Sequence, residues 1–332
     1  MKLRLLFVLS TIWFGVDSIA QSDALGPDFT CSKLDDHGVL WLGSEADGLW
    51  KVQHNSIERY VVGGLPNPIQ CYSMTLDPQG HLWLASRNEL IEYDYERWRE
   101  IPITDAGTAD IGNVAAVTEK KRIIRSITVN HLDHVLMGCE DATTGQQILM
   151  RFNGHTYVDL IKPFKVSGVF EDLDALIWMA EGAYKMEAGK LILKVSLPHG
   201  LINTALQDSR GDVWLAIDQG GIYRYDGQNF RFYGDDHGFS DIRISCLHED
   251  ERGRIWMGTE KNDDSQSQGL SYFEAGAFHH LQDSPECPVK SVNTIASDKK
   301  GVVWFAGNNG AMYRYSGRNF YTVETTDLLQ KR

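Results

Sequence analysis

Short runs of alternating apolar and polar residues follow one another along almost the whole chain. Around Trp83 they cover residues 72–76, 81–85, 90–93 and 97–101, and turn-forming residues bound each of them. Runs of this kind, rich in β-branched and aromatic residues, are typical of half-buried β-strands. Because no helical periodicity of any length interrupts them, the pattern predicts an all-β protein.

One of these runs recurs seven times, and it carries a large apolar anchor. The spacing between anchors is 36 to 53 residues, and a glycine or alanine always stands two residues after the anchor. The anchors are Trp41, Trp83, Leu136, Trp178, Trp214, Trp256 and Trp304. A self-similar period of about 40 residues indicates a repeat architecture.

An aspartate marks the turn that precedes six of the seven anchors. Aspartate accepts hydrogen bonds from backbone amides two residues on, and the glycine that follows in most copies can adopt a positive φ. We therefore interpret the residues six before the anchors as structural turn residues: Asp35, Asp77, Asp172, Asp208, Asp250 and Asp298, with Asn130 in the third copy. The tryptophan is expected to pack on the adjacent sheet, and the small residue to let neighbouring sheets approach.

Four strands in each of seven repeats predict a single seven-bladed β-propeller of four-stranded antiparallel blades, spanning residues 21–332. Residues 100–121 form a surplus between the second and third copies, which we expect to be a long loop with room for one extra strand. The sequence leaves open which strand closes the ring.

The first twenty residues have a different character. Lys2 and Arg4 precede an apolar run at residues 5–16, and Ser18 and Ala20 are small. This order predicts a signal peptide, residues 1–20, cleaved after Ala20. This run of twelve residues is too short to span a bilayer. We expect a periplasmic or secreted protein without stable membrane insertion.

The net charge limits the classes of partner, and the cysteine count limits the possible disulfides. The formal net charge of −13 argues against nucleic acid as a partner, because such binding needs a basic surface. Five scattered cysteines in an exported protein leave at least one free thiol. Cys31 and Cys246 occupy the same repeat position, elsewhere held by small residues, so we interpret them as small residues too.

The repeat resembles a known family. Residues 35–44, 208–226, 250–259 and 298–315 carry the pattern Asp-x-x-Gly-x-aliphatic-Trp followed by Gly-x-x-Arg-Tyr or a close variant, and residues 64–66 and 237–239 carry its Gly-Leu-Pro and His-Gly-Phe elements. Over about residues 28–325 this is similar to the two-component-regulator propeller repeat. The resemblance implies a periplasmic ligand-sensing propeller of the kind found in hybrid sensor kinases, here without the kinase part.

A ring of polar residues marks the candidate binding site. Near the start of each innermost strand, five residues before the aspartate, stands a residue that can form hydrogen bonds. The predicted ligand-binding residues at this channel mouth are Tyr72, Arg125, Ser167, Asn203, Arg243, Ser245 and Asn293. The alternative is that a wet channel has a polar lining whatever its function. The longest loops after the second strand, residues 140–147 and 260–268, favour the same face.

No catalytic motif is present, so no catalytic residue, metal ligand or cofactor is predicted, although a propeller active site can be assembled from distant loops. The leading hypothesis is an exported, noncatalytic, sensor-like propeller that recognises a small molecule or oligosaccharide at the loop-rich face and feeds a two-component signalling system. One alternative is a scaffold that docks a membrane-bound sensor or another envelope protein. The other is a lyase or hydrolase whose site is not visible in the sequence.

Overall fold

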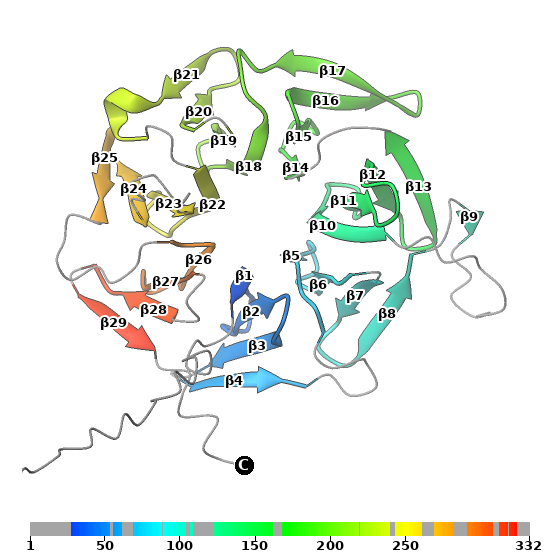
Figure 1. The fold of residues 1–332 in the computed structure, drawn as a ribbon, viewed down its shortest axis with the longest axis horizontal. Helices are drawn as coiled ribbons and strands as arrows, with labels where there is room; N and C mark the ends of the chain where they lie inside the picture. The colour runs from blue at the N-terminus through cyan, green and yellow to red at the C-terminus, as the bar shows by residue number, and fades with distance from the viewer. Residues whose placement is uncertain are drawn as a thin grey trace, which may run out of the picture.

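The computed structural model describes residues 28–53, 56–61, 69–87, 89–103, 107–108, 122–161, 168–218, 220–239, 243–260, 269–281, 291–307, 312–317 and 319–323. Their strands form seven sheets arranged around a common centre, as Figure 1 shows. The prediction of a seven-bladed β-propeller is therefore confirmed. The predicted signal peptide lies outside the described residues.

Each blade contains four antiparallel strands that pair in the order in which they occur along the chain. Blade 1 comprises β1 (Phe29–Leu34), β2 (Leu40–Ser44), β3 (Gly48–Gln53) and β4 (Ser56–Tyr60); blade 2 comprises β5 (Ser73–Leu76), β6 (Leu82–Ala85), β7 (Glu89–Tyr93) and β8 (Trp98–Pro102). Blade 3 comprises β10 (Arg122–Val129), β11 (Val135–Asp141), β12 (Gln147–Phe152) and β13 (Thr156–Ile161); blade 4 comprises β14 (Phe170–Glu171), β15 (Ile177–Met179), β16 (Gly182–Glu187) and β17 (Lys190–Ser196).

The remaining three blades follow the same plan. Blade 5 comprises β18 (Ile202–Gln207), β19 (Val213–Ile217), β20 (Ile222–Tyr225) and β21 (Phe230–Tyr233); blade 6 comprises β22 (Arg243–Glu249), β23 (Ile255–Glu260), β24 (Leu270–Glu274) and β25 (Ala277–His280). Blade 7 comprises β26 (Thr294–Ser297), β27 (Val303–Ala306), β28 (Met312–Tyr315) and β29 (Phe320–Val323). The first strand of each blade is innermost and the fourth lies at the rim (Figure 1).

The surplus between the second and third copies contributes one short strand. β9 (Gly107–Thr108) pairs with β13, with Thr156 opposite Thr108 and Tyr157 opposite Gly107. It is the fifth strand of the blade 3 sheet, at its outer edge. The predicted loop with one extra strand therefore widens this blade and adds no eighth one among the described residues.

The core consists of apolar clusters between neighbouring blades. Trp214 of blade 5, for example, is fully buried in a cluster with Ile244, Ile255, Met257 and Phe273 of blade 6. Each of the seven anchors lies in the cluster shared with the following blade. Burying one such indole contributes on the order of 3 kcal/mol, so the expected packing of the anchor on the adjacent sheet holds the ring together.

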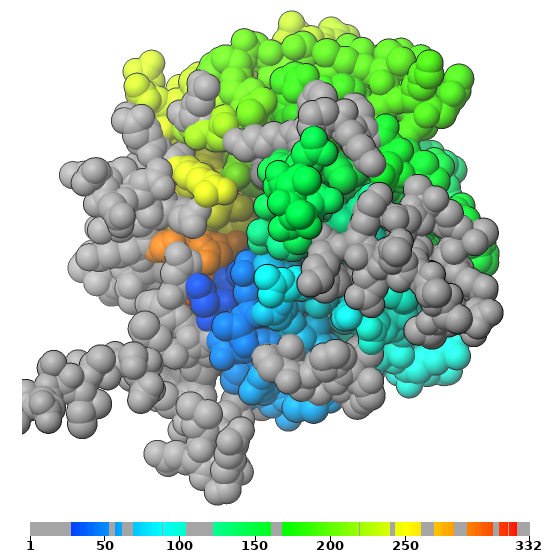
Figure 2. All heavy atoms as spheres, turned by 45° about the vertical axis from the view of Figure 1, so that its right-hand side comes forward, coloured from blue at the N-terminus to red at the C-terminus, as the bar shows by residue number. Residues whose placement is uncertain are grey.

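The ring closes where blade 7 meets blade 1, an interface that we call the seam. Figure 2 shows the start of the described chain, in blue, beside residues from late in the sequence, in orange. Phe29 and Leu42 of blade 1 pack there with Ala306 and Met312 of blade 7. Within the described residues no strand from one end of the chain joins the blade at the other end, so packing and side-chain contacts close the ring.

Helical structure is minimal in the described part of the chain. It contains one 3-10 turn, η1 (Asp235–His237). None of its helices has the length and apolarity needed to cross a membrane.

Candidate functional site

The repeated aspartates are occupied by donors from their own turns. In blade 5, Asp208 Oδ1 accepts the backbone amides of Arg210 and Asp212, each at 3.0 Å, and Oδ2 accepts the indole Nε1–H of Trp214 at 3.0 Å. The same bond to the indole six residues on, at 2.7–2.9 Å, is made by Asp35, Asp77, Asp172 and Asp250. In blade 7, Asp298 Oδ1 accepts the amides of Lys300 and Val302, each at 2.9 Å. These carboxylates fix the turn and the anchor.

The third copy changes both members of this pair together. Leu136 replaces the tryptophan, and Asn130 replaces the aspartate. Asn130 Oδ1 still accepts the amides of Leu132 and His134 at 3.0 and 2.9 Å, so the turn is unchanged. Since the side chain of leucine has no N–H group, a second acceptor oxygen is not needed. The joint replacement of aspartate and tryptophan is visible in the sequence, but its reason, the carboxylate–indole hydrogen bond, is visible only in the structure.

The polar ring at the channel mouth joins neighbouring blades. In four blades the ring residue donates a hydrogen bond to the carbonyl oxygen at the start of the next blade's inner strand. The pairs are Thr30 to Cys71 at 2.9 Å, Asn203 to Ile244 at 2.7 Å, Ser245 to Val292, and Asn293 to Phe29 at 3.5 Å. The last pair crosses the seam. Four side chains of the ring thus stabilise the ring of blades itself.

Two arginines of the predicted ring still present charge to solvent. Arg125 and Arg243 are both exposed. The guanidinium of Arg125 lies 5.3 Å from the centroid of the Tyr72 ring and pairs with Glu140 at 3.2 Å. Arg243 donates to Asn203 Oδ1 at 3.1 Å. Ser167, the remaining predicted ring residue, lies outside the described residues.

Deeper in the ring, the innermost strands carry two groups that the sequence analysis did not identify. Lys33 is exposed although it lies on β1, the innermost strand of its blade (Figure 1). Among the described residues no hydrogen-bond or ion-pair partner of its ammonium is found, and burial by the surrounding strands lowers its pKa. His248, on the inner strand of blade 6, forms a hydrogen bond of 2.8 Å between its Nε2 and Ser297 Oγ. Burial, and then the positive charge of Lys33, lowers the pKa of His248 to about 4.

The position of Lys33 could have been noticed in the sequence. It stands two residues before its aspartate, where the other copies have Thr75, Thr128, Phe170, Leu206, His248 and Ala296. A single lysine in this series, within an acidic chain, is the signal. The sequence analysis did not identify Lys33 because it based the candidate site on the position five residues before the aspartate, which is polar in every copy.

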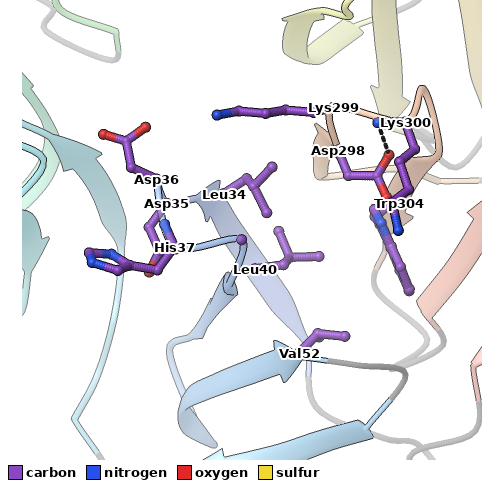
Figure 3. A pocket seen from close by; sticks show the side chains of 11 residues that line it. Leu34, Asp35, Asp36, His37, Leu40, Val52, Asp298, Lys299, Lys300 and Trp304 are labelled. Atoms are coloured by element: carbon purple, nitrogen blue, oxygen red, sulfur yellow. Dashed lines mark hydrogen bonds between the residues drawn. The ribbon is translucent and has the colours of Figure 1, made fainter.

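The described residues also form hollows on the face that carries the β1–β2 turns, opposite the face predicted to bind ligand. One, of about 450 Å³, lies at the seam and is shown in Figure 3. Asp36 and His37 of blade 1 line it on one side, and Lys299 of blade 7 extends toward them from the other. Its walls therefore carry both signs of charge.

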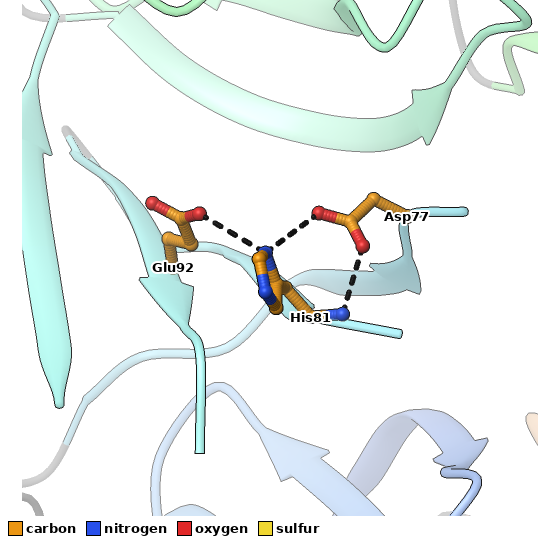
Figure 4. Close-up of side chains that lie close together, drawn as sticks. All are labelled: Asp77, His81 and Glu92. Carbon is orange, nitrogen blue, oxygen red and sulfur yellow. Dashed lines mark hydrogen bonds and ion pairs between the residues drawn. The ribbon is translucent and has the colours of Figure 1, made fainter. Parts of the chain in front are cut away.

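A second hollow, of about 410 Å³, lies between blades 2 and 3 and includes a compact group of ionisable side chains. Figure 4 shows His81 between Asp77 and Glu92. Its Nδ1 lies 3.2 Å from Asp77 Oδ2 and 3.5 Å from Glu92 Oε1, and the three ligand-type atoms lie within 4.8 Å of one another. Asp77 Oδ2 also accepts the Trp83 indole at 2.9 Å.

Comparison with blade 5 explains this group without a metal ion. Glu92 lies opposite Trp83 across β6 and β7, as Arg224 lies opposite Trp214 across β19 and β20. In blade 5, Arg224 Nε donates to Asp212 Oδ2 at 2.8 Å, and Asp212 stands at the same repeat position as His81. Blade 2 therefore has a carboxylate where blade 5 has a guanidinium and an imidazole where blade 5 has a carboxylate, and Glu92 also accepts a hydrogen bond from Arg99 Nε at 2.8 Å. The sequence-based prediction of no metal ligand remains a prediction.

Comparison with known proteins agrees with the repeat. Residues 238–261 match a family model described as "Two component regulator propeller", so the resemblance recognised from the sequence is confirmed for this repeat. No curated protein is significantly similar to the chain in sequence.

Solved structures of several functional classes share the fold. The extracellular domain of a putative hybrid two-component system from B. thetaiotaomicron is similar at a TM-score of 0.66 and 16% identity, over 88% of this chain and 39% of that one. YCF48 bound to D1 peptide matches at 0.60 and 12% identity, over 88% and 92% of the two chains. Virginiamycin B lyase from Staphylococcus aureus matches at 0.57 and 12% identity, over 86% and 93%. At these identities the likeness shows the fold alone.

The chain spans about two fifths of the sensor chains that it matches. The shares are 39% for the putative hybrid two-component system and 38% for a putative one-component system from the same organism.

Proposed function

We propose that this protein is an exported, noncatalytic, sensor-like propeller that binds a small anionic ligand, such as a uronic-acid oligosaccharide, in its central channel and feeds a two-component signalling system. The match of residues 238–261 to the two-component-regulator propeller model supports the sensor role. The two similar sensor structures are extracellular domains, which supports a location outside the cytoplasm.

The observation that carries the choice of ligand is Lys33. Lys33 is exposed on an innermost strand, which we take to face the centre of the ring, and no partner for its ammonium is found among the described residues. A cation without a counter-charge lowers the free energy of an anion placed beside it, and the surrounding strands screen this attraction less than bulk water does. Carboxylate and phosphate oxygens are the matching acceptors for an ammonium group.

The charge of the whole chain makes this local site selective. With a net charge of −13, the surface repels anions. The exposed Arg125 and Arg243 lie near the start of inner strands of the same ring, where Arg125 pairs with Glu140 and Arg243 donates to Asn203. Cationic groups at the centre of an acidic protein would attract an anion there and not to the general surface. The hydroxyls of Thr30 and Ser245 donate to backbone carbonyls but keep lone pairs that can accept a hydrogen bond from a sugar hydroxyl.

Isothermal titration calorimetry with oligogalacturonate, a neutral oligosaccharide of equal length and inorganic phosphate tests the proposal. We expect the acidic sugar alone to bind, and Lys33→Ala to weaken it by about tenfold or more, which corresponds to roughly 1.4 kcal/mol. Lys190→Ala is the matched control, because Lys190 is an exposed lysine on β17 at the rim. It should leave the affinity unchanged.

Three results would count against the proposal. Equal weakening by both lysine variants would mean that only the net charge matters. Binding of the neutral sugar, indifferent to Lys33, would place the site elsewhere. Cleavage of the acidic sugar during the titration would favour the lyase alternative, for which Lys33 and His248 are the perturbed groups of the channel.

A further inference from the structure

Two thiols from neighbouring blades meet inside the ring. Cys31 Sγ, on β1 of blade 1, lies 3.6 Å from Cys71 Sγ, at the entry to blade 2. Cys71 is fully buried and Cys31 is half-buried. The residues are forty positions apart in the chain, so the contact exists only because the two blades pack against each other.

The backbone around this pair is fixed by contacts that leave room for both sulfurs. Cys71 N–H donates to Ser44 O at 3.1 Å, and its carbonyl accepts the Thr30 hydroxyl at 2.9 Å. Both sulfurs lie over Gly43, where a Cβ would approach Cys31 Sγ to 2.5 Å and Cys71 Sγ to 2.6 Å. The glycine of the repeat thus provides a space that the two side chains share.

The equivalent place between blades 6 and 7 provides an internal comparison. There Cys246 lies over Gly258 as Cys31 lies over Gly43, but its neighbour in the next blade is Val292. The position of Cys71 holds an apolar residue in the other described copies: Phe29, Ile124, Ile202, Ile244 and Val292. Among the described residues, only the interface of blades 1 and 2 has a cysteine on both sides.

We propose that Cys31 and Cys71 form a disulfide that cross-links blades 1 and 2 when the protein meets a disulfide oxidant outside the cytoplasm. Closing the pair to the S–S bond length of about 2.0 Å requires side-chain rotation over about 1.5 Å. This inference goes beyond the proposed function and does not depend on ligand binding.

The oxidation balances with a low-molecular-weight disulfide such as oxidised glutathione. The Cys31 thiolate attacks one glutathione sulfur, forming a mixed disulfide and releasing one glutathione thiolate. Cys71 then gives up its proton to solvent and attacks Cys31 Sγ, which releases the second glutathione. Two protein thiols are oxidised and one glutathione disulfide is reduced. Cys31 reacts first because the neighbouring thiol and burial raise the pKa of Cys71.

Thiol counting on the whole protein tests the inference. The reduced chain is unfolded, refolded in a glutathione redox buffer, and alkylated under denaturing conditions. From five cysteines we expect three alkylated thiols, with Cys31 and Cys71 joined in the peptide map. Cys31→Ser and Cys71→Val should keep all four of their thiols, and the matched control Cys246→Ser should keep two of its four.

Thermal unfolding gives a second measurement that is independent of alkylation. Closing a loop of forty residues should raise the Tm of the oxidised protein above that of the reduced one by about 5 °C or more. Cys71→Val, which copies the interface of blades 6 and 7, should fold and show no redox-dependent shift. Five free thiols after refolding in the redox buffer, or a disulfide mapped to another pair, would overturn the proposal.

Discussion

In five of the seven turns a single carboxylate binds both the turn amides and the indole of the anchor. One oxygen of Asp208 accepts two turn amides, and the other accepts the indole of Trp214 and the guanidinium of Arg210. Burial alone would raise the pKa of Asp208, but these donors outweigh it and hold the pKa below its usual value. In the third copy, with Asn130 and Leu136, the donor and the second acceptor are absent together.

Asp208→Asn should therefore destabilise the protein at neutral pH, by about 1–3 kcal/mol, because the amide nitrogen cannot accept the Trp214 N–H. The lowered pKa adds a pH dependence: the stabilisation is present above about pH 4 and is lost as the pH falls through the folded pKa. Urea unfolding at pH 7 and below pH 4 measures both.

Two controls make this prediction specific. Asp36→Asn changes an exposed turn carboxylate in blade 1 and should cost less than about 0.5 kcal/mol. Combining Asp208→Asn with Trp214→Phe should lower the free energy of unfolding by less than the sum of the two single effects, because both changes remove the same hydrogen bond. Strict additivity would show that the carboxylate and the indole act independently.

The distance between blades is set by the small residue two positions after the anchor. At Gly258 a Cβ would lie 2.5 Å from Cys246 Sγ and 2.6 Å from the carbonyl oxygen of Val292 in blade 7. The second contact is to backbone, which cannot rotate away. Blades 2, 4, 5 and 7 have alanine at this position, so their interfaces accommodate a Cβ for which the interface at Gly258 has no room.

Gly258→Ala is expected to lower the free energy of unfolding by about 1–3 kcal/mol through overpacking between β23 and blade 7. Equilibrium urea unfolding checks this, and Gly258→Ala with Cys246→Ala separates the two contacts. The double variant should remain destabilised because the Val292 carbonyl still lies in the way. Full recovery on removal of the sulfur would mean that the backbone contact is unimportant.

The ring is covalently continuous at six interfaces and open at the seventh. At the seam, Ser32 Oγ and Thr294 Oγ1 lie 2.5 Å apart, and Asn293 bonds to Phe29 O. Asn203 makes the same kind of bond, at 2.7 Å, between blades 5 and 6, which the chain also connects. The same type of hydrogen bond therefore occurs once at the seam, where the chain does not connect the blades, and once where it does.

Asn293→Ala should open the ring locally, whereas Asn203→Ala should not. Amide hydrogen exchange is the appropriate measurement, because it reports local opening strand by strand. We expect faster exchange in β1 and β26 for the seam variant, and little change in β18 and β22 for the control. Equal effects in the two variants would show that the seam is no weaker than the other interfaces.

Much of this molecule could be predicted from residue order alone. The strands of blade 2 begin and end within one residue of their predicted positions, because the turn residues that bound them are local signals. The candidate site was predicted less well. Asn203, Ser245 and Asn293 were correctly placed at the start of inner strands, but their use in joining blades depends on carbonyl groups about forty residues or more away.

The sequence by itself determined the repeat, the number of blades, the turn chemistry and the anchors, since each follows from contacts within about ten residues. Only the tertiary structure decided what meets across blades: Lys33 close enough to His248 to lower its pKa, Cys31 against Cys71, and Asn293 against Phe29 at the seam. The physical reason is that a propeller places residues one repeat apart in van der Waals contact, and local patterns carry no information about that distance.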